Sequence, residues 1–273
     1  MEDIGNLYLE TEDKKIIQNE KYNFKFNTKF KFLAGQYGLR AGCIHIILGA
    51  SSGGKSTLVR SLVSDIYENN SSTENVMLWL SEDSLSDIKI EFADTLIRPE
   101  SLQSIKCLSE LDISSEGRKM GHKYVFDYIR RFHPRILIFD NITTSKFYND
   151  MEPREQADFA FELKELAQQY NIAMVLVAHT NAIVDLNCQR LINMNDIRGT
   201  KTIVNLTQYY YILQTVKYEQ QYLTTIRVLK QRGYNKEGSI YGLIYDSCLR
   251  LFIRDEPMNF EKFKYFFKKR DHL

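Results

Sequence analysis

The chain has 273 residues, of which 44% are hydrophobic and 26% charged, as is ordinary for a globular protein. Its formal net charge of +1 excludes a chain that is basic throughout, so any contact with nucleic acid must come from local patches. The four cysteines form no CxxC pair, and no signal peptide or membrane-length apolar run is recognisable, so we expect a reduced cytoplasmic protein without structural zinc.

Residues 1–28 are polar and irregular, and we expect them to form an arm or linker. Over residues 29–254, apolar strand patterns alternate with helical patterns, which predicts an α/β fold whose largely parallel sheet has helices on both faces. The predicted strands are 44–48, 76–80, 104–108, 135–139 and 172–177, and the predicted helices are 56–67, 87–96, 119–132 and 153–170.

The pattern changes after about Thr207. Three strand-like runs separated by turn residues, at 209–213, 223–229 and 239–245, predict antiparallel or mixed strands that complete the sheet. Residues 255–273 mix Lys with Phe, and we expect them to form a basic helical tail.

A glycine-rich segment, Gly-Ala-Ser-Ser-Gly-Gly-Lys-Ser, fits the pattern G-x-x-x-x-G-K-[ST] completely and stands between a predicted strand and a predicted helix. In this pattern the backbone N–H groups surround phosphate oxygens, the lysine reaches the β- and γ-phosphates, and the hydroxyl ligates Mg²⁺. The sequence therefore predicts a P-loop that binds ATP and Mg²⁺. The expected nucleotide contacts are Gly49, Ser52, Gly53, Gly54, Lys55, Ser56 and Thr57.

Asp140 ends the apolar strand predicted over 135–139. A carboxylate at the carboxyl edge of such a sheet lies beside the phosphate loop, so we expect Asp140 to join Ser56 in holding Mg²⁺. The alternative is that Asp140 and the following Asn141 only open a turn.

Two further strands end in groups that can do chemistry. Glu82 and Asp83 follow the strand 76–80, where a carboxylate can activate water, or where Ser81 to Ser84 can simply cap the next helix. His179 follows the strand 172–177, where it can donate a hydrogen bond to the γ-phosphate or be structural.

The order of these motifs, continued by Ile197-Arg198-Gly199-Thr200 and Lys230-Gln231-Arg232, resembles that of the RecA-type hexameric helicases. It is similar to the DnaB family and more similar still to the small RepA-type helicases of plasmids and phages. The resemblance covers about residues 30–250 and implies a RecA-like domain. Two departures are the lack of room for the additional N-terminal domain of DnaB proteins, and Thr200 in place of the usual Ser.

The resemblance also implies residue roles. RecA-like ATPases carry their water-activating glutamate where this chain has Glu82, whereas AAA+ proteins carry it beside the later aspartate, where this chain has Asn141. Lys230 and Arg232 match a Lys-x-Arg motif whose arginine reaches the nucleotide of the adjacent subunit in a ring. The alternative for this triplet is a solvated turn.

Two loops of such a motor would face single-stranded nucleic acid, at 143–152 and 181–198. The candidate phosphate contacts are Arg190, Arg198 and Lys201. Asp150, Glu152, Asp185 and Asp196 offset the positive charge of these loops, which weakens the case for DNA. A solvated surface connection is the alternative for both.

The sequence thus favours an ATP-hydrolysing hexameric ring that acts on single-stranded nucleic acid, such as a replicative DNA helicase of a plasmid, phage or mobile element. The alternative is an ATP-switched assembly, regulatory or defence-associated ATPase that acts on a protein partner. A genome-packaging ATPase would share the same motifs. Because these choices rest on analogy of fold, they need a functional test.

Overall fold

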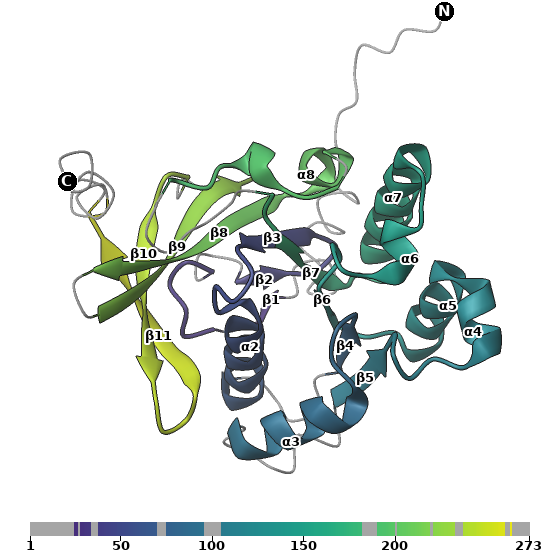
Figure 1. Cartoon of the computed structure of the whole chain (residues 1–273), viewed down its shortest axis with the longest axis horizontal. Coiled ribbons are helices and arrows are strands. Elements are labelled where there is room, and N and C mark those ends of the chain that lie inside the picture. Colours follow the sequence, from purple (N-terminus) through teal and green to yellow (C-terminus); the bar gives the residue numbers. More distant parts are fainter. Residues whose placement is uncertain are drawn as a thin grey trace, which may run out of the picture.

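Short apolar runs that are buried on both faces form most of the central sheet, as expected for strands covered by helices. The computed structural model describes residues 25–26, 28–33, 38–69, 75–95, 105–181, 190–199, 201–218, 221–232, 237–259 and 263 (Figure 1). The sheet has nine strands in the order β11-β10-β9-β8-β3-β7-β6-β4-β5. Its strands are β3 (Ile44–Gly49), β4 (Val76–Leu80), β5 (Ile105–Ser109), β6 (Ile136–Asp140), β7 (Ala173–His179), β8 (Tyr209–Tyr218), β9 (Gln221–Gln231), β10 (Ile240–Asp246) and β11 (Leu251–Met258).

The six strands from β5 to β8 pair in parallel, and β9, β10 and β11 add antiparallel strands beyond β8. This arrangement confirms the largely parallel sheet and its mixed C-terminal extension. A separate two-stranded ladder joins β1 (Lys25–Phe26) to β2 (Leu39–Arg40).

Helices cover both faces of the sheet (Figure 1). Buried residues of α2 (Lys55–Asn69) and α3 (Leu85–Thr95) belong to the apolar cluster on one face. The cluster on the other face includes residues of α5 (His122–Phe132), α7 (Pro153–Gln169) and α8 (Thr202–Leu206). The short helices are α4 (Ser115–Met120), α6 (Lys146–Asn149) and the 3₁₀ turn η2 (Met194–Asp196). Among the described residues, no helix has the length and apolarity needed to cross a membrane.

Local chemistry explains where several helices begin and end. Pro153 opens α7, where its missing N–H costs nothing, and Glu152 and Glu155 form a capping box. The single helix predicted over 119–132 is instead two helices, because Gly121 adopts a φ of 61° and interrupts the helical path.

Both predicted domain boundaries differ from the structure by a few residues. Phe26 lies in β1 and is buried, and the Thr28 hydroxyl donates to the Asp65 carboxylate, so the fold begins before residue 29. At the other end, β11 continues to Met258, and the Asp255 carboxylate accepts from the backbone N–H groups of Lys31 and Phe32. Of the predicted basic tail beyond β11, the structure describes only Asn259 and Phe263, so its helical character stays a prediction.

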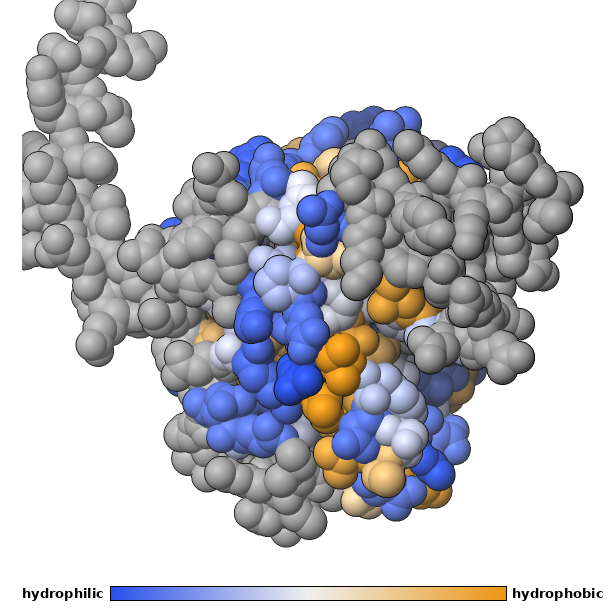
Figure 2. All heavy atoms as spheres, turned by 90° about the vertical axis from the view of Figure 1, so that its left-hand side faces the viewer, coloured by the Kyte–Doolittle hydropathy of each residue, from blue (hydrophilic) through white to orange (hydrophobic). Residues whose placement is uncertain are grey.

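Strand β11 is an edge of the sheet, and its sequence disfavours pairing with another chain. Arg254 and Glu256 form an exposed ion pair at 3.3 Å, and Pro257 cannot donate to a ladder. Figure 2 views the molecule from this side and shows hydrophilic residues beside a strip of apolar ones. The charges and the proline protect this edge from pairing, while β11 packs on α2 within the chain.

Candidate active site

The glycine-rich loop lies where the carboxyl ends of four parallel strands meet. Gly49 at the end of β3 pairs with His179 at the end of β7, and Leu80 of β4 pairs with Asp140 of β6. Ligands of open α/β sheets bind in the crevice outside these carboxyl ends. A cavity of about 270 Å³ lies there, lined by Ser52, Gly53, Gly54, Lys55, Ser56, Thr57, Glu82, Asp140, Asn141 and His179.

The glycines of the loop are required by its backbone. A Cβ on Gly53 would lie 2.9 Å from the Ala50 carbonyl oxygen, and Gly54 has a φ of 86°. This tight turn leads directly into α2, so backbone N–H groups at the helix N-terminus face the cavity. The cavity is therefore suited to an anionic group.

Lys55 supplies a buried cation to this cavity. It is 6% exposed, and its Nζ donates to the Ala50 carbonyl at 2.6 Å. Burial lowers the pKa of Lys55, while the nearby carboxylates of Asp140 and Glu82 act in the opposite direction. The ammonium group is thus aimed across the loop, where it would meet the outer phosphates of a nucleotide.

Asp140 is buried beside the first turn of α2. Burial raises its pKa to about 6, and the Ser56 hydroxyl as a hydrogen-bond partner and the Lys55 charge oppose that rise. A hydroxyl oxygen and a carboxylate oxygen side by side are the donor types that Mg²⁺ prefers, with phosphate and water oxygens completing the shell. The residues expected to hold Mg²⁺ therefore lie together and fit that ion.

Glu82 projects into the same cavity from the end of β4. Its Oε1 accepts from Asn141 Nδ2 at 3.3 Å and lies 3.8 Å from His179 Nε2. Asp83, the alternative base, does not line the cavity, and burial raises its pKa with help from the carboxylates of Glu91 and Glu82. This geometry favours Glu82 over Asp83 as a base.

His179 connects the glycine-rich loop to the segment that follows β7. Its Nδ1 is 2.9 Å from the Ser51 hydroxyl, and its carbonyl accepts from the Arg198 N–H at 3.1 Å. Burial lowers the pKa of His179, the Lys55 and Arg198 charges lower it further, and Glu82 opposes them. A neutral imidazole is therefore favoured at pH 7, with one nitrogen able to donate.

Sequence reasoning missed two residues of this site. Ser51 contacts His179, and Asn141 contacts Glu82 from a position 59 residues away in the chain. The sequence gives Asn141 only as a possible turn residue after Asp140 and as the residue at the place where AAA+ proteins carry their glutamate. The available signal for a site residue was a polar side chain directly after the buried strand β6. That Glu82 is its partner depends on the order of the strands in the sheet, which local sequence does not give.

The structure places Lys230 and Arg232 away from this cavity. Gln231 pairs with Tyr209, and Tyr209 pairs with His45 near the beginning of β3, whereas the glycine-rich loop follows the end of β3. Lys230 Nζ donates to the Val204 carbonyl at 3.2 Å, and Arg232 is exposed. Neither residue reaches the cavity of its own chain.

The candidate nucleic-acid contacts are exposed, but only part of their surroundings is described. Arg190 pairs with Asp196 at 2.7 Å, while Arg198 and Lys201 are exposed at the end of this segment. Residues 182–189 of the predicted loop, and Thr200 beyond its end, lie outside the described residues. The structure therefore brings none of these three side chains into the cavity.

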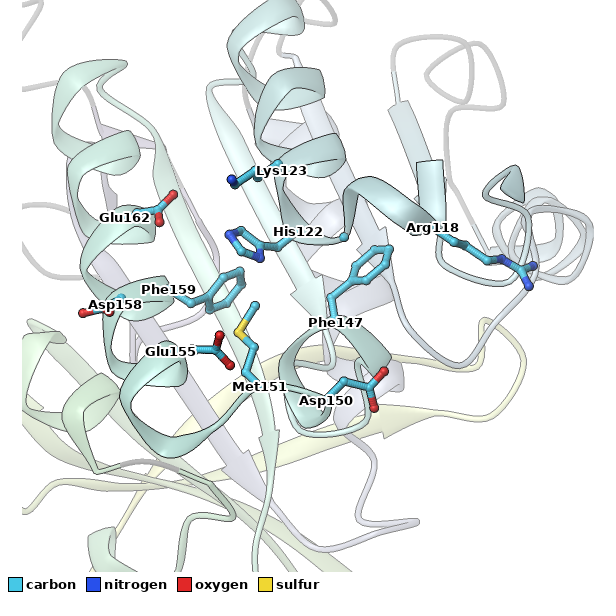
Figure 3. Close-up of a pocket in the computed structure, with 11 residues that line it drawn as sticks. Arg118, His122, Lys123, Phe147, Asp150, Met151, Glu155, Asp158, Phe159 and Glu162 are labelled. Atoms are coloured by element: carbon cyan, nitrogen blue, oxygen red, sulfur yellow. The ribbon is translucent and has the colours of Figure 1, made fainter. Parts of the chain in front are cut away.

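A second cavity of about 450 Å³ lies between α5, α6 and α7 (Figure 3). Its apolar wall is formed by Phe147, Met151 and Phe159, and its carboxylates belong to Asp150, Glu155, Asp158 and Glu162. It is larger than the cavity beside the glycine-rich loop, but the two cavities share no lining residue. We therefore do not assign the proposed chemistry to it. It adjoins the segment that follows Asn141.

Neither a comparison with protein-family models nor one with curated protein sequences finds a match to this chain.

Proposed function

We propose that the protein is a Mg²⁺-dependent ATPase with a RecA-like fold. The observation that carries this proposal is the convergence of Lys55, Ser56, Asp140 and Glu82 on one cavity beside a glycine-rich turn. Lys55 and Ser56 lie at the start of α2, Glu82 follows β4, and Asp140 ends β6. Each of these side chains suits a separate task in phosphoryl transfer.

In this proposal the loop N–H groups and Lys55 hold the β- and γ-phosphates and offset negative charge in the transition state. Ser56 and Asp140 would hold Mg²⁺, which neutralises phosphate charge when bound. Glu82 accepts the proton of the attacking water, and Asn141 and His179 limit where its carboxylate can lie. His179 is placed to donate to the γ-phosphate from β7.

We further propose that the chain assembles into a hexameric ring that moves along single-stranded DNA. The ordered motifs support this, as does the position of Arg232, which is exposed and remote from its own cavity. An arginine in that place contributes to catalysis only through a neighbouring chain, and a head-to-tail interface that closes produces a ring.

Single-stranded DNA is expected to raise the steady-state ATPase rate of the wild-type protein at least several-fold. Such a motor couples hydrolysis to its track, and the Arg198 and Lys201 side chains are exposed for phosphate contacts. The rate should be measured with and without oligonucleotide at several salt concentrations, with Lys55→Ala as the blank. A rate indifferent to DNA at every salt concentration would remove the motor part of the proposal and leave the ATPase part standing.

Arg232→Ala is expected to lower hydrolysis by about 10³-fold, as loss of an arginine finger does. Mixing Arg232→Ala subunits with Lys55→Ala subunits should restore activity, because some interfaces then combine an intact Lys55 with an intact Arg232. The control is each variant alone at the same total concentration. Full activity of Arg232→Ala, or no recovery on mixing, would contradict a role between subunits.

A second candidate function is an ATP-switched assembly protein with a protein partner. The observation that favours it is the engagement of Arg190 by Asp196, which leaves less free positive charge on the predicted DNA-binding segment. Recovery of one protein partner in the ATP state but not the ADP state, with a DNA-independent ATPase rate, would select this function.

A further inference from the structure

Asn141 is the buried polar residue that joins the separate parts of the candidate site. It is 2% exposed and follows Asp140 directly at the end of β6. Its Nδ2 donates to Glu82 Oε1 at 3.3 Å, and its Oδ1 accepts from the Thr144 N–H at 2.9 Å and from the Thr143 hydroxyl at 2.9 Å. Both ends of the side-chain amide are therefore engaged.

The orientation of this amide follows from the chemistry of its neighbours. A backbone N–H can only donate, so the atom that meets Thr144 N must be the amide oxygen. An ionised carboxylate can only accept, so the atom that meets Glu82 must be the amide nitrogen. The reverse orientation would place two donors together at one end and two acceptors together at the other.

Glu82 needs such a contact because few groups among the described residues hold its side chain. Its side chain is 53% exposed, and its other close partner, His179 Nε2, is 3.8 Å away. A general base must be aimed at the attacking water, and a misplacement of about 1 Å can cost roughly 100-fold in rate. Asn141 orients the Glu82 carboxylate from a buried, hydrogen-bonded position at the end of β6.

The Asn141 amide is also hydrogen-bonded to the segment that follows β6. Thr143 donates to Asn141 Oδ1 and accepts from the backbone N–H of His179 at 2.9 Å. The Ser81 hydroxyl donates to the Asn141 carbonyl and accepts from the Asn141 N–H, which fixes the two strand ends together. Phe147, farther along this segment, lines the second cavity (Figure 3). A displacement of the segment would therefore move the amide that holds Glu82.

We propose that Asn141 is a positioning residue for hydrolysis. Its amide nitrogen orients the Glu82 carboxylate, and its amide oxygen is held in place by hydrogen bonds from Thr143 and Thr144. The inference rests on the proposed ATPase function. Through Thr143, it also links the base to His179 on β7. The position of the segment that follows Asn141 thereby determines whether the Glu82 carboxylate is oriented toward the attacking water.

The test is Asn141→Asp, which keeps an acceptor for Thr143 and Thr144 but removes the donor to Glu82. We expect kcat for ATP hydrolysis to fall about 10- to 100-fold, the range that orienting partners of site residues typically supply. The Kd of a fluorescent ATP analogue and the melting temperature should stay close to wild type. Asn75→Asp is the matched control, because it makes the same amide-to-acid change at a half-buried asparagine whose Nδ2 donates to the Phe132 carbonyl at 3.0 Å and which does not line the cavity.

Combining Asn141→Asp with Glu82→Gln separates positioning from general damage. If Asn141 acts through Glu82, the double variant is no slower than Glu82→Gln alone. Additive losses, an unchanged kcat in Asn141→Asp, or a loss of analogue binding that parallels the loss of kcat would each overturn the inference. Equal rates for wild type and Lys55→Ala would instead show that the proposed ATPase function fails, and the inference with it.

Discussion

Glu82→Gln is expected to lower kcat for ATP hydrolysis by about 10²- to 10⁴-fold, the usual contribution of a general base. The substitution keeps the shape of the side chain and the acceptor for Asn141 Nδ2, but removes the group that takes a proton from water. Affinity for ATP should change little, because the proposed phosphate contacts are the loop and Lys55 and not Glu82. Single-turnover hydrolysis and analogue binding measure the two quantities separately.

Asp83→Asn is the matched control, since it makes the same acid-to-amide change at the adjacent position. The Asp83 side chain does not line the cavity, so its loss should leave kcat within a few-fold of wild type. If Asp83→Asn abolishes hydrolysis and Glu82→Gln does not, the roles of the two carboxylates are exchanged.

Asp140→Asn is expected to stabilise the nucleotide-free protein at pH 8 while abolishing Mg²⁺-dependent hydrolysis. Burial raises the pKa of Asp140 from 3.8 to about 6, so its folded form prefers to be protonated. The stability that this provides is fully present below the unfolded pKa of about 4 and is lost as the pH rises through about 6. At about 1.4 kcal/mol per pKa unit, the ionised carboxylate costs up to about 3 kcal/mol at pH 8.

The neutral amide avoids this cost, although Lys55 then loses a favourable charge partner. We expect the melting temperature at pH 8 to rise by several degrees, since about 1 kcal/mol corresponds to roughly 2–4 °C in a chain of this size. The difference from wild type should shrink toward pH 4.5, where Asp140 is protonated. A melting temperature equal to or below that of wild type at pH 8 would contradict this account of the buried carboxylate.

Local sequence predicted the parts of the fold that depend on local patterns. The glycine-rich loop follows from glycines at 53 and 54, which its backbone demands, and β4 and β6 follow from uninterrupted apolar runs. Strand β11 was missed because charged residues and Pro257 interrupt its alternation, and because its apolar residues pack on α2, which is distant in the sequence. The break at Gly121 was missed because a single glycine in a helical pattern is usually tolerated.

The site was predictable to the extent that strand ends converge in a parallel sheet. That rule alone places Glu82, Asp140 and His179 at one edge of the sheet. It did not distinguish Glu82 from Asp83, because the choice depends on which side chain faces the cavity. It also gave no partner for Asn141, because the contact of its amide with Glu82 requires β4 to lie beside β6.

The release of phosphate from ATP in the presence of Mg²⁺, compared between wild type and Lys55→Ala, tests the central claim most directly. Lys55 is the buried cation aimed across the glycine-rich loop, and its removal should lower the rate by about 10²-fold or more. The account predicts steady turnover by the wild-type protein and almost none by the variant, with both proteins folded. Equal rates for the two would contradict it.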